Sequence, residues 1–459
     1  MAVMSVVRRR PGCVVAGLLA LSLSCADPQG TEPDSSAPAL AKGSGGALSV
    51  TSTSPSYGDQ GTINLDVHVL GSGFDQGSRA SWEKNGVPYA KITVNSTSFV
   101  NSGDLLANIT IAADAVIDFY DVAVYTGTGK KGIGTELFEV TTAHVIGDAG
   151  GVTDAFGISG LGQVVGSTGS SAFFWDPLVG VMEVIEPTGV AFDIDRAGTT
   201  IGGRDDDVVA PTERATLWIQ TGSSWQKQAL PDIGAGGAVR GMASNAVSGK
   251  ATFLAGWVWM PGGGRVRARW TPSGSGWTVD TFPLPAGPTN GMGWDVNALG
   301  MMVGFDGTGC CWALYWDPSG APQALPRING TASTAWAISE DGLRIVGGSN
   351  DRAVIWTRSS TSVSWTSQPT PLEDPAKVCG KGGRTATSLA EDINADGTIV
   401  GVSCDQAVAW RPNGAGGYTR IQLGGIGSHC IHGCRARAIN DAGTAAGKAS
   451  DVAVYWSGF

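Results

Sequence analysis

The apolar positions of the chain come in short runs that glycine, asparagine, aspartate and proline interrupt, and long amphipathic helical stretches are hard to find. In the segment 48–82 four aliphatic side chains fall two residues apart, as on one buried strand face: Ile63, Leu65, Val67 and Val69. The segments 105–111 and 120–126 alternate in the same way. Short strands separated by turn residues predict an all-β protein.

Residues 143–459 repeat one pattern seven times. Each copy has an aliphatic residue, a polar residue, two free positions, a glycine and a strand that closes on glycine. The copies are ISGLGQVVG (158–166), IDRAGTTIGG (194–203), the distorted ASNAVSGKATFLAG (243–256), VNALGMMVG (296–304), ISEDGLRIVG (338–347), INADGTIVG (393–401) and INDAGTAAG (439–447). A tryptophan follows each copy, mostly in the sequence Ala-x-x-Trp: Trp175, Trp218, Trp270, Trp316, Trp356, Trp410 and Trp456.

Successive tryptophans stand 40 to 54 residues apart, a period typical of propeller blades with several strands each. The polar residue is suited to hold a tight turn, the glycine to adopt a positive φ, and the tryptophan to bury a large area between blades. The last copy ends one strand short, and the segment 137–148 offers the missing strand. We therefore expect a seven-bladed β-propeller over residues 143–459, closed by a strand from about 137–148.

The repeat also resembles a known family. The turn I-N-x-x-G-x-x-V-G followed by A-F-x-W is similar to the HAF-repeat extracellular proteins, a set of exported bacterial β-propeller-like repeats. The tripeptide that names the family is present only as Ser171-Ala172-Phe173, with serine in place of histidine. The resemblance implies an architecture and an exported protein, and it implies no reaction.

Within residues 46–142, Pro55 and Gly58 precede a long strand, Gly71-Ser72-Gly73-Phe74 ends it, and a later strand contains Tyr120-Asp121-Val122. These features resemble an IPT/TIG immunoglobulin-like domain. The resemblance implies a small β-sandwich that acts as a spacer or a contact module. The expected fold class is therefore an immunoglobulin-like β-sandwich followed by the propeller.

Residues 1–25 are predicted to be a signal peptide. Three arginines precede the apolar run 14–24, which is too short to span a bilayer but suits a secretory signal. The sequence LSLSC resembles a bacterial lipobox, with Ser22 where leucine is preferred, and the resemblance implies lipidation of Cys25. Ordinary cleavage after Ala26 and an uncleaved anchor are the alternatives.

The polar residues 26–45 predict a flexible linker. With the signal peptide, they indicate an exported chain, either a cell-envelope or outer-membrane lipoprotein or a secreted protein.

Six cysteines fall in the last four repeats: Cys310, Cys311, Cys379, Cys404, Cys430 and Cys434. An even number in an oxidising compartment predicts disulfides. The favoured pairs are Cys379–Cys404 and Cys430–Cys434, with Cys310 and Cys311 bridged to each other or split. A zinc site built from Cys430 and Cys434 with His429 and His432 is the alternative.

Asp392, Asn394 and Asp396 imitate the start of an EF-hand calcium loop. The twelfth position is Ser403 rather than glutamate, and strands rather than helices are expected on both sides. Turn chemistry accounts for the pattern, so the three residues are weak metal candidates, and we expect no metal or other cofactor.

Six residues stand two positions before the repeat aliphatic: Phe156, Phe192, Trp294, Trp336, Glu391 and Arg437. Equivalent sites recur around the axis of a propeller, so these side chains would form a ring of aromatic and charged groups. Such a ring is suited to stacking a sugar or gripping a peptide; packing between blades is the alternative. None of the four histidines lies near a G-x-S-x-G serine, and no catalytic residue is predicted.

The net charge is −10 and there is no basic stripe, which argues against nucleic acid and anionic lipid as partners. Contact with a membrane would run only through the lipid anchor at Cys25. We expect a non-enzymatic binding or adhesion module that contacts a surface protein, peptide or glycan through propeller loops. The alternatives are a hydrolase or lyase of polysaccharide or glycoconjugate, and a structural surface-layer component. An enzyme should gather several carboxylates, or an acid with His or Tyr, in one central pocket.

Overall fold

The computed structural model describes residues 47–147, 151–206, 213–234, 236–282, 291–307, 312–374, 379, 387–427 and 433–459. Within these ranges the chain is all-β apart from one turn of 3-10 helix, Ile328–Gly330. No helix in the described ranges is long and apolar enough to cross a membrane. The signal peptide, Cys25 and the whole linker 26–45 lie outside the described residues.

The described part of residues 143–459 forms seven four-stranded antiparallel sheets. Sheet 1 contains β11 (Thr153–Ile158), β12 (Val164–Thr168), β13 (Ser171–Trp175) and β14 (Met182–Glu186). Sheet 2 contains β15 (Gly189–Ile194), β16 (Thr200–Asp205), β17 (Arg214–Thr221) and β18 (Ser224–Ala229). Sheet 3 contains β19 (Gly237–Ser244), β20 (Ala251–Trp259), β21 (Arg265–Ser273) and β22 (Gly276–Phe282).

The remaining sheets continue the same order. Sheet 4 contains β23 (Met292–Val296), β24 (Met302–Asp306), β25 (Trp312–Trp316) and β26 (Pro322–Ala324). Sheet 5 contains β27 (Ser333–Ile338), β28 (Arg344–Ser349), β29 (Arg352–Thr357) and β30 (Thr370–Pro371). Sheet 6 contains β31 (Ser388–Ile393), β32 (Ile399–Ser403), β33 (Gln406–Pro412) and β34 (Tyr418–Gln422), and sheet 7 contains β35 (Cys434–Ile439), β36 (Ala445–Ala449), β37 (Val452–Trp456) and β10 (Ala143–Val145).

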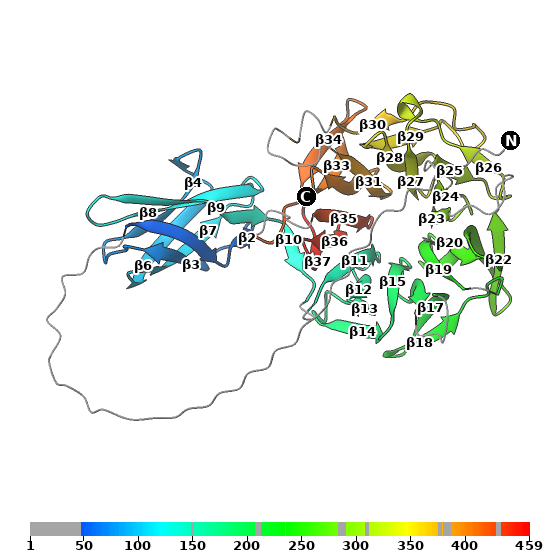
Figure 1. Cartoon of the computed structure of the whole chain (residues 1–459), viewed down its shortest axis with the longest axis horizontal. Coiled ribbons are helices and arrows are strands. Elements are labelled where there is room, and N and C mark those ends of the chain that lie inside the picture. The colour runs from blue at the N-terminus through cyan, green and yellow to red at the C-terminus, as the bar shows by residue number, and fades with distance from the viewer. Residues whose placement is uncertain are drawn as a thin grey trace, which may run out of the picture. The chain divides into compact units, whose positions relative to one another are not determined.

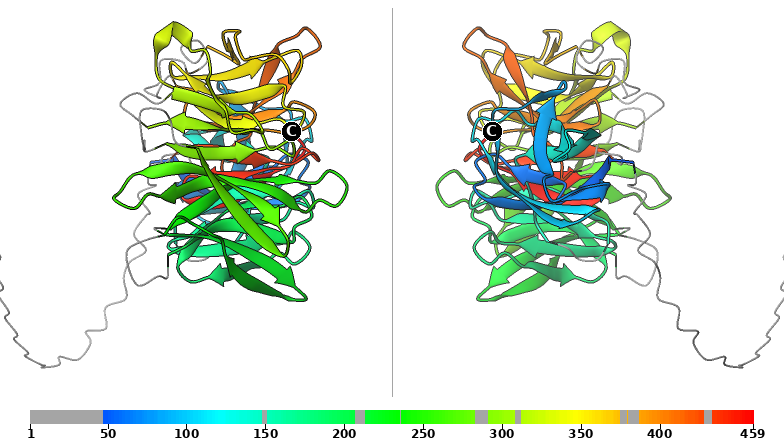
Figure 2. Two further views of the ribbon diagram at one scale, coloured as in Figure 1. Left: turned by 90° about the vertical axis from the view of Figure 1, so that its right-hand side faces the viewer. Right: turned by 90° about the vertical axis from the view of Figure 1, so that its left-hand side faces the viewer.

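The sheets surround a common centre, and the first strand of each repeat lies innermost (Figure 1). Each sheet contacts the next one along the chain, and sheet 7 contacts sheet 1 through β36 and β11. The arrangement is of the β-propeller type. The side views in Figure 2 show the twist of the sheets, which strands of L-residues adopt by default.

The fourth strand of sheet 7 comes from upstream of the repeats. β10 pairs antiparallel with β37, with Ala143 opposite Trp456 and Val145 opposite Val454. This pairing joins a segment that precedes the first repeat to the strand that ends the last one.

The seven repeat tryptophans are all buried, with at most 5% of any of them exposed. Each one packs in a cluster that includes residues of the preceding sheet. Trp410 of sheet 6 packs with Val346 and Ile355 of sheet 5, and Trp175 of sheet 1 packs with Ala446 of sheet 7. Because each tryptophan is covered by a neighbouring sheet, no sheet buries its own core alone.

The turn after each inner strand follows the chemistry that the repeat predicts. The seven turn glycines have φ from 67° to 82°: Gly162, Gly198, Gly249, Gly300, Gly342, Gly397 and Gly443. Asn394 accepts a hydrogen bond from the Thr398 amide at 2.9 Å and donates one to the carbonyl of Asn440 at 3.2 Å. Asn440 in turn donates to the carbonyl of Ser159 at 3.0 Å, which joins sheet 7 to sheet 1. The side chain of Asn394 is therefore bonded to backbone groups, and the carboxylate of Asp392 likewise accepts the amides of Ile393 and Ile439.

Residues 49–141 form two further sheets. One has the order β1 (Ser49–Ser54), β3 (Leu65–Ser72), β7 (Asp104–Ile111) and β6 (Ile92–Asn101). The other has the order β2 (Tyr57–Asp59), β9 (Lys131–Thr141), β8 (Asp118–Tyr125), β4 (Arg79–Lys84) and β5 (Val87–Pro88). A single core cluster draws on both sheets, including Val67, Leu105, Trp82 and Phe138.

The end of β9 contacts the loop that follows β34. The carboxylate of Glu139 accepts hydrogen bonds from the amides of Gly425 at 2.6 Å and Gly427 at 2.8 Å. The hydroxyl of Thr141 donates to the carbonyl of Gly425 at 2.8 Å. Burial raises the pKa of Glu139 to about 7.

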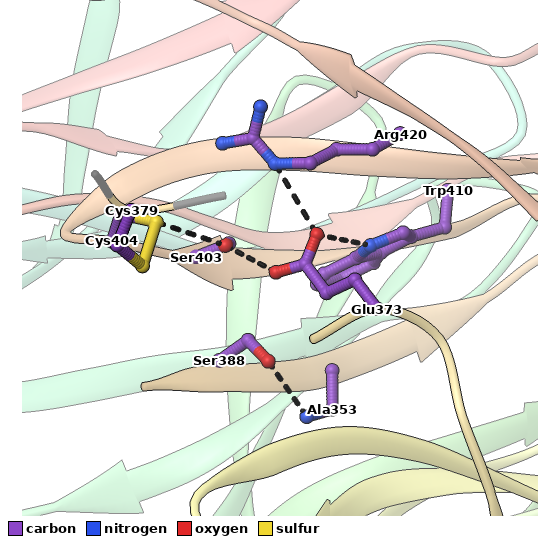
Figure 3. The surroundings of a disulfide bond; sticks show 8 residues. All are labelled: Ala353, Glu373, Cys379, Ser388, Ser403, Cys404, Trp410 and Arg420. Carbon is purple, nitrogen blue, oxygen red and sulfur yellow. Dashed lines mark hydrogen bonds and ion pairs between the residues drawn. A yellow bond between two sulfur atoms is a disulfide. The ribbon is translucent and has the colours of Figure 1, made fainter. Parts of the chain in front are cut away.

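The expected disulfide Cys379–Cys404 is confirmed. Figure 3 shows it beside Glu373, which accepts hydrogen bonds from Ser403 and from the indole of Trp410. Cys434 is also disulfide-bonded, so its sulfur is not a free thiolate for zinc. The other cysteine predictions and the zinc alternative fall on residues outside the described ranges: Cys310, Cys311, Cys430, His429 and His432.

Candidate functional site: a central cavity lined by seven bulge residues

Each inner strand carries a β-bulge at the same place. The pairing of the inner strand with its neighbour shifts around one residue in every sheet: Phe156, Phe192, Arg240, Trp294, Trp336, Glu391 and Arg437. A bulge leaves one residue outside the ladder and re-aims its side chain. Six of the seven are the ring residues expected from the sequence. Arg240 was missed because the third repeat is distorted, although it stands two positions before Met242, where the other copies have their aliphatic residue.

The seven bulge residues line one cavity of about 80 Å³. Its lining also includes Asp193, Asp295 and Asp392, each directly after a bulge. A second cavity of about 140 Å³ lies toward the turns and shares Asp193 and Asp392 with the first. The sequence-predicted ring residues therefore meet at one place, and three aspartates that the ring prediction did not include lie beside them.

The aromatic rings of the cavity pack on one another and on arginine. Trp294 and Trp336 are stacked with centroids 4.4 Å apart, and Phe156 meets Phe192 edge-on at 5.4 Å. The guanidinium carbon of Arg240 lies 4.2 Å from the ring centroid of Phe192 and 4.4 Å from that of Trp294. These contacts take up ring faces that the sequence had suggested for stacking a sugar.

The charged members of the ring join sheet 7 to its two neighbours. Arg437 donates two hydrogen bonds to the carboxylate of Asp154 in sheet 1, at 2.9 and 2.6 Å. It also lies 3.6 Å from Glu391 in sheet 6, and Arg435 donates a hydrogen bond to the same carboxylate. Both carboxylates are therefore paired with arginine, in the bidentate manner for Asp154 that the guanidinium fork favours.

The three aspartates are held by backbone amides. Asp295 accepts from its neighbour Val296 at 2.7 Å and from Ile338 of the next sheet at 2.9 Å. Asp392 accepts from Ile393 at 2.7 Å and from Ile439 of the next sheet at 2.8 Å. Each carboxylate thus connects its own sheet to the following one.

Asp193 is also held by backbone amides of its own sheet and of the next one. Its carboxylate accepts the amide of Ile194 at 2.8 Å and also that of Met242 in sheet 3. Burial raises the pKa of Asp193 to about 8 and that of Asp392 to about 7, and it raises the pKa of Asp295 well above its ordinary value. In the sheets that lie between those of the three aspartates, the residue after the bulge is small. Gly157 is one example, since a Cβ there would lie 2.8 Å from the Cα of Asp193.

Arg240 is the exception among these charges. It forms no ion pair and no hydrogen bond with the residues that the structure describes, and its Nε is buried without a partner. The indole Nε1 of Trp294 is also buried without a hydrogen-bond partner in that part of the chain. Burial, and secondarily the charge of Arg437, lower the pKa of Arg240 to about 9, so the side chain remains charged at neutral pH.

On the turn side, Arg196 of sheet 2 pairs with Asp441 of sheet 7 at 2.5 Å. The pair passes over sheet 1, where a Cβ on Gly160 would lie 2.8 Å from the Cγ of Arg196. Among the described residues no group of three or more His, Cys, Asp or Glu is arranged to hold a metal ion.

No protein-family model matches the sequence, and a search of curated proteins finds no match. Among solved structures, TolB from Acinetobacter baumannii gives a TM-score of 0.31 at 13% identity over 53% of this chain and 60% of that protein. Apo AztD from Citrobacter koseri gives a TM-score of 0.31 at 12% identity, over 82% of this chain and 86% of that protein. The Niastella koreensis GH74 enzyme gives a TM-score of 0.25 at 11% identity, over 87% of this chain and 62% of that protein. The chain covers less than two thirds of TolB, so the likeness spans only part of it. Because these scores and identities are low, the fold rests on the observed sheet order and no activity is taken from the neighbours.

Proposed function

We propose that the chain is an exported, non-enzymatic binding module whose ligand enters the central cavity. In this proposal the seven sheets are the blades of one seven-bladed propeller of HAF-like repeats over residues 143–459. Residues 46–142 are an IPT/TIG-like spacer, and residues 1–25 are a lipoprotein signal that leaves Cys25 as the anchored end. The partner is a surface peptide, protein or glycan.

One observation carries the choice of binding over catalysis. Carboxylates do gather in the cavity, as an enzyme would require, but each of them already has partners. Asp193, Asp295 and Asp392 are held by amides, and Glu391 is held by arginines. General acid–base chemistry needs a carboxyl group within reach of a substrate proton, and among the described residues neither a histidine nor a tyrosine lines this cavity.

The alternative, a hydrolase or lyase of polysaccharide or glycoconjugate, gains some support from the raised pKa of Asp193 and Asp392. A carboxyl group that is protonated near neutral pH can act as a general acid. Against this, each of the two groups bonds two backbone amides from two different sheets, which suits a structural connection.

A glycan and peptide array tests the proposal, with product release from every bound ligand measured in parallel. The purified chain should bind at least one ligand class, and Trp336→Ala should lose that binding without any product being released by the parent protein. Trp312→Ala is the control, because Trp312 is 43% exposed and lies outside the cavity. Saturable product release that Glu391→Gln or Asp392→Asn abolishes would instead establish the enzyme.

A further inference from the structure

We infer that the central cavity is a receptor for a carboxylate group carried at the end of a narrow chain, and that Arg240 is the residue that binds it. This inference rests on the proposed function and names the class of ligand. It starts from the only cavity-lining arginine for which the described residues provide no anionic partner.

Among the charged side chains at the cavity, Arg240 has no ion-pair partner in the described residues. Arg437 and Arg435 share Asp154 and Glu391. Arg240 lies against aromatic rings and forms no ion pair with the described residues, so Asp154, Asp193 and Glu391 act on it only at longer range. Arg240 is partly buried, its Nε is buried without a partner, and no carboxylate of the described residues lies within ion-pair distance of it. Such a guanidinium is costly, and a ligand that supplies negative charge lowers that cost. The binding energy therefore favours an anion over a neutral ligand.

The surroundings of Arg240 select a flat anion. Rings from the two neighbouring sheets, Phe192 and Trp294, lie over the guanidinium at 4.2 and 4.4 Å, so a ligand approaches it along its edge rather than over its faces. A carboxylate can bind this edge in the plane of the guanidinium. A tetrahedral phosphate or sulfate is thicker and would push the rings apart.

The same cavity is lined by a second residue with an unpaired donor. The buried Nε1–H of Trp294 has no partner in the described chain, and an indole can only donate. A carboxylate has two oxygens with room for about four hydrogen bonds. We infer that the carboxylate accepts from Arg240 with one oxygen and from Trp294 with the other, which would satisfy both donors.

The size of the cavity limits what can enter. At about 80 Å³ it is smaller than the ~150 Å³ apolar cavity that holds benzene. A whole pyranose ring is larger than benzene, so of the partners named in the proposed function the cavity favours the end of a peptide over a sugar ring; a carboxyl group with one or two carbons fits. The ligand is therefore a small aliphatic acid or the carboxylate end of a longer molecule such as a peptide.

Isothermal titration and ligand-observed NMR with sodium propionate test the inference on the purified full chain. Propionamide is the neutral control of the same shape, and inorganic phosphate is the tetrahedral control. A short peptide with a free carboxyl terminus, compared with its amidated form, separates a peptide source from a free acid. We expect propionate or the free-acid peptide to bind, and both neutral forms and phosphate to bind on the order of tenfold more weakly or not at all, as for loss of a charge-assisted hydrogen bond.

Arg240→Met should abolish this binding while the variant remains folded, with a Tm equal to or above that of the parent protein, since an unpaired buried charge is removed. Arg327→Met is the matched control, because Arg327 also lies over a tryptophan, Trp312, but outside the cavity. Trp294→Phe, which removes the indole donor, should weaken binding to a smaller extent.

Three results would overturn the inference: equal affinity for propionate and propionamide, propionate binding that survives Arg240→Met, or no binding of any carboxylate. If the array identifies a neutral ligand that Trp336→Ala loses, the inference is wrong and the proposed function stands. If neither experiment detects a ligand, both are wrong.

Discussion

Around the central cavity, acidic and small residues alternate from sheet to sheet at the position after the bulge. Asp193, Asp295 and Asp392 alternate with Gly157, Gly241, Ala337 and Ala438. A Cβ at Gly241 would lie 2.7 Å from the Cα of Asp295, so the small residue leaves the space that its neighbour occupies. Each aspartate can then reach the backbone of the following sheet, and the inner strands are connected by partly buried carboxyl groups.

This arrangement predicts that stability falls as the pH rises from about 5 to 8. Burial and the nearby Asp295 raise the pKa of Asp193 from 3.8 to about 8, partly offset by its amide bonds and by Arg240. Between those two values the folded chain holds a proton that the unfolded chain has lost, so the stabilisation is present below about pH 4 and is lost as the pH passes the folded pKa. One such group contributes at most about 1.4 kcal/mol per pH unit. Urea unfolding at pH 5, 6, 7 and 8 measures the slope.

Asp193→Asn should reduce that slope because the amide does not titrate, whereas Asp66→Asn, at an exposed position of β3, should leave it unchanged. A parent protein whose stability rises over this range, or an Asp193→Asn variant with the parental slope, would show that the carboxyl group is ionised in the folded chain.

The repeat alignment predicts which individual residues line the cavity. It does not predict which side chains they contact, and those contacts determine whether a side chain is free to bind a ligand. Phe156 and Trp336 could be placed in a ring by counting from the repeat aliphatic, but the count does not show that Phe156 meets Phe192 edge-on or that Trp336 stacks on Trp294. Arg240 was lost because the third copy departs from the pattern. The role of Asp193 could not be recognised, since a bulge that turns two successive side chains toward the centre breaks the period of two that a strand prediction assumes.

At the scale of the element, the repeat combines a turn that fixes one hairpin with a tryptophan that needs the neighbouring sheet. Both features are local in sequence, which is why the sequence predicts them well. The turn requires a positive φ at one position, as at Gly397, where φ is 81°. The tryptophan requires small partners opposite, and Trp456 packs with Ala407 and Ala409 of sheet 6. The disulfide between Cys379 and Cys404 was one favoured choice among many pairings, because cysteine spacing alone does not determine connectivity.

Trp410→Ala should destabilise the protein by about 3–5 kcal/mol, as removal of a buried tryptophan leaves a cavity that neighbouring sheets cannot fill. Trp410 is fully buried and its indole donates to Glu373 at 3.1 Å. Chemical denaturation of the Trp410→Ala variant and of a Trp312→Ala control measures the loss of unfolding free energy. Trp312→Ala, on an exposed edge where Arg327 covers the ring, should cost about 1 kcal/mol or less. Equal losses at the two positions would mean that packing between sheets is not what Trp410 provides.

At the scale of the whole molecule, the sheets form a ring because the last one contacts the first. The amide of Thr153 in sheet 1 donates to the carbonyl of Asp451 at 2.9 Å, and its hydroxyl accepts the amide of Ala453 at 2.6 Å. β10 completes sheet 7 from the other side. The sequence indicates such a closing strand only because the last repeat ends one strand short. The ligand leaves no signal in the repeats, because the cavity exists only after all seven inner strands have met.

Closure of the ring brings the bulge residues around one cavity, so the proposed binding site exists only if sheet 7 meets sheet 1. A double-mutant cycle on Asp154 and Arg437 tests it most directly, because this pair joins sheet 1 to sheet 7 across 283 residues. The free energies of unfolding of Asp154→Asn, Arg437→Met and the double variant are compared with that of the parent protein. A closed ring predicts a coupling energy of about 1–3 kcal/mol. Additive effects of the two substitutions would show that sheets 1 and 7 do not meet in solution, and they would contradict the account.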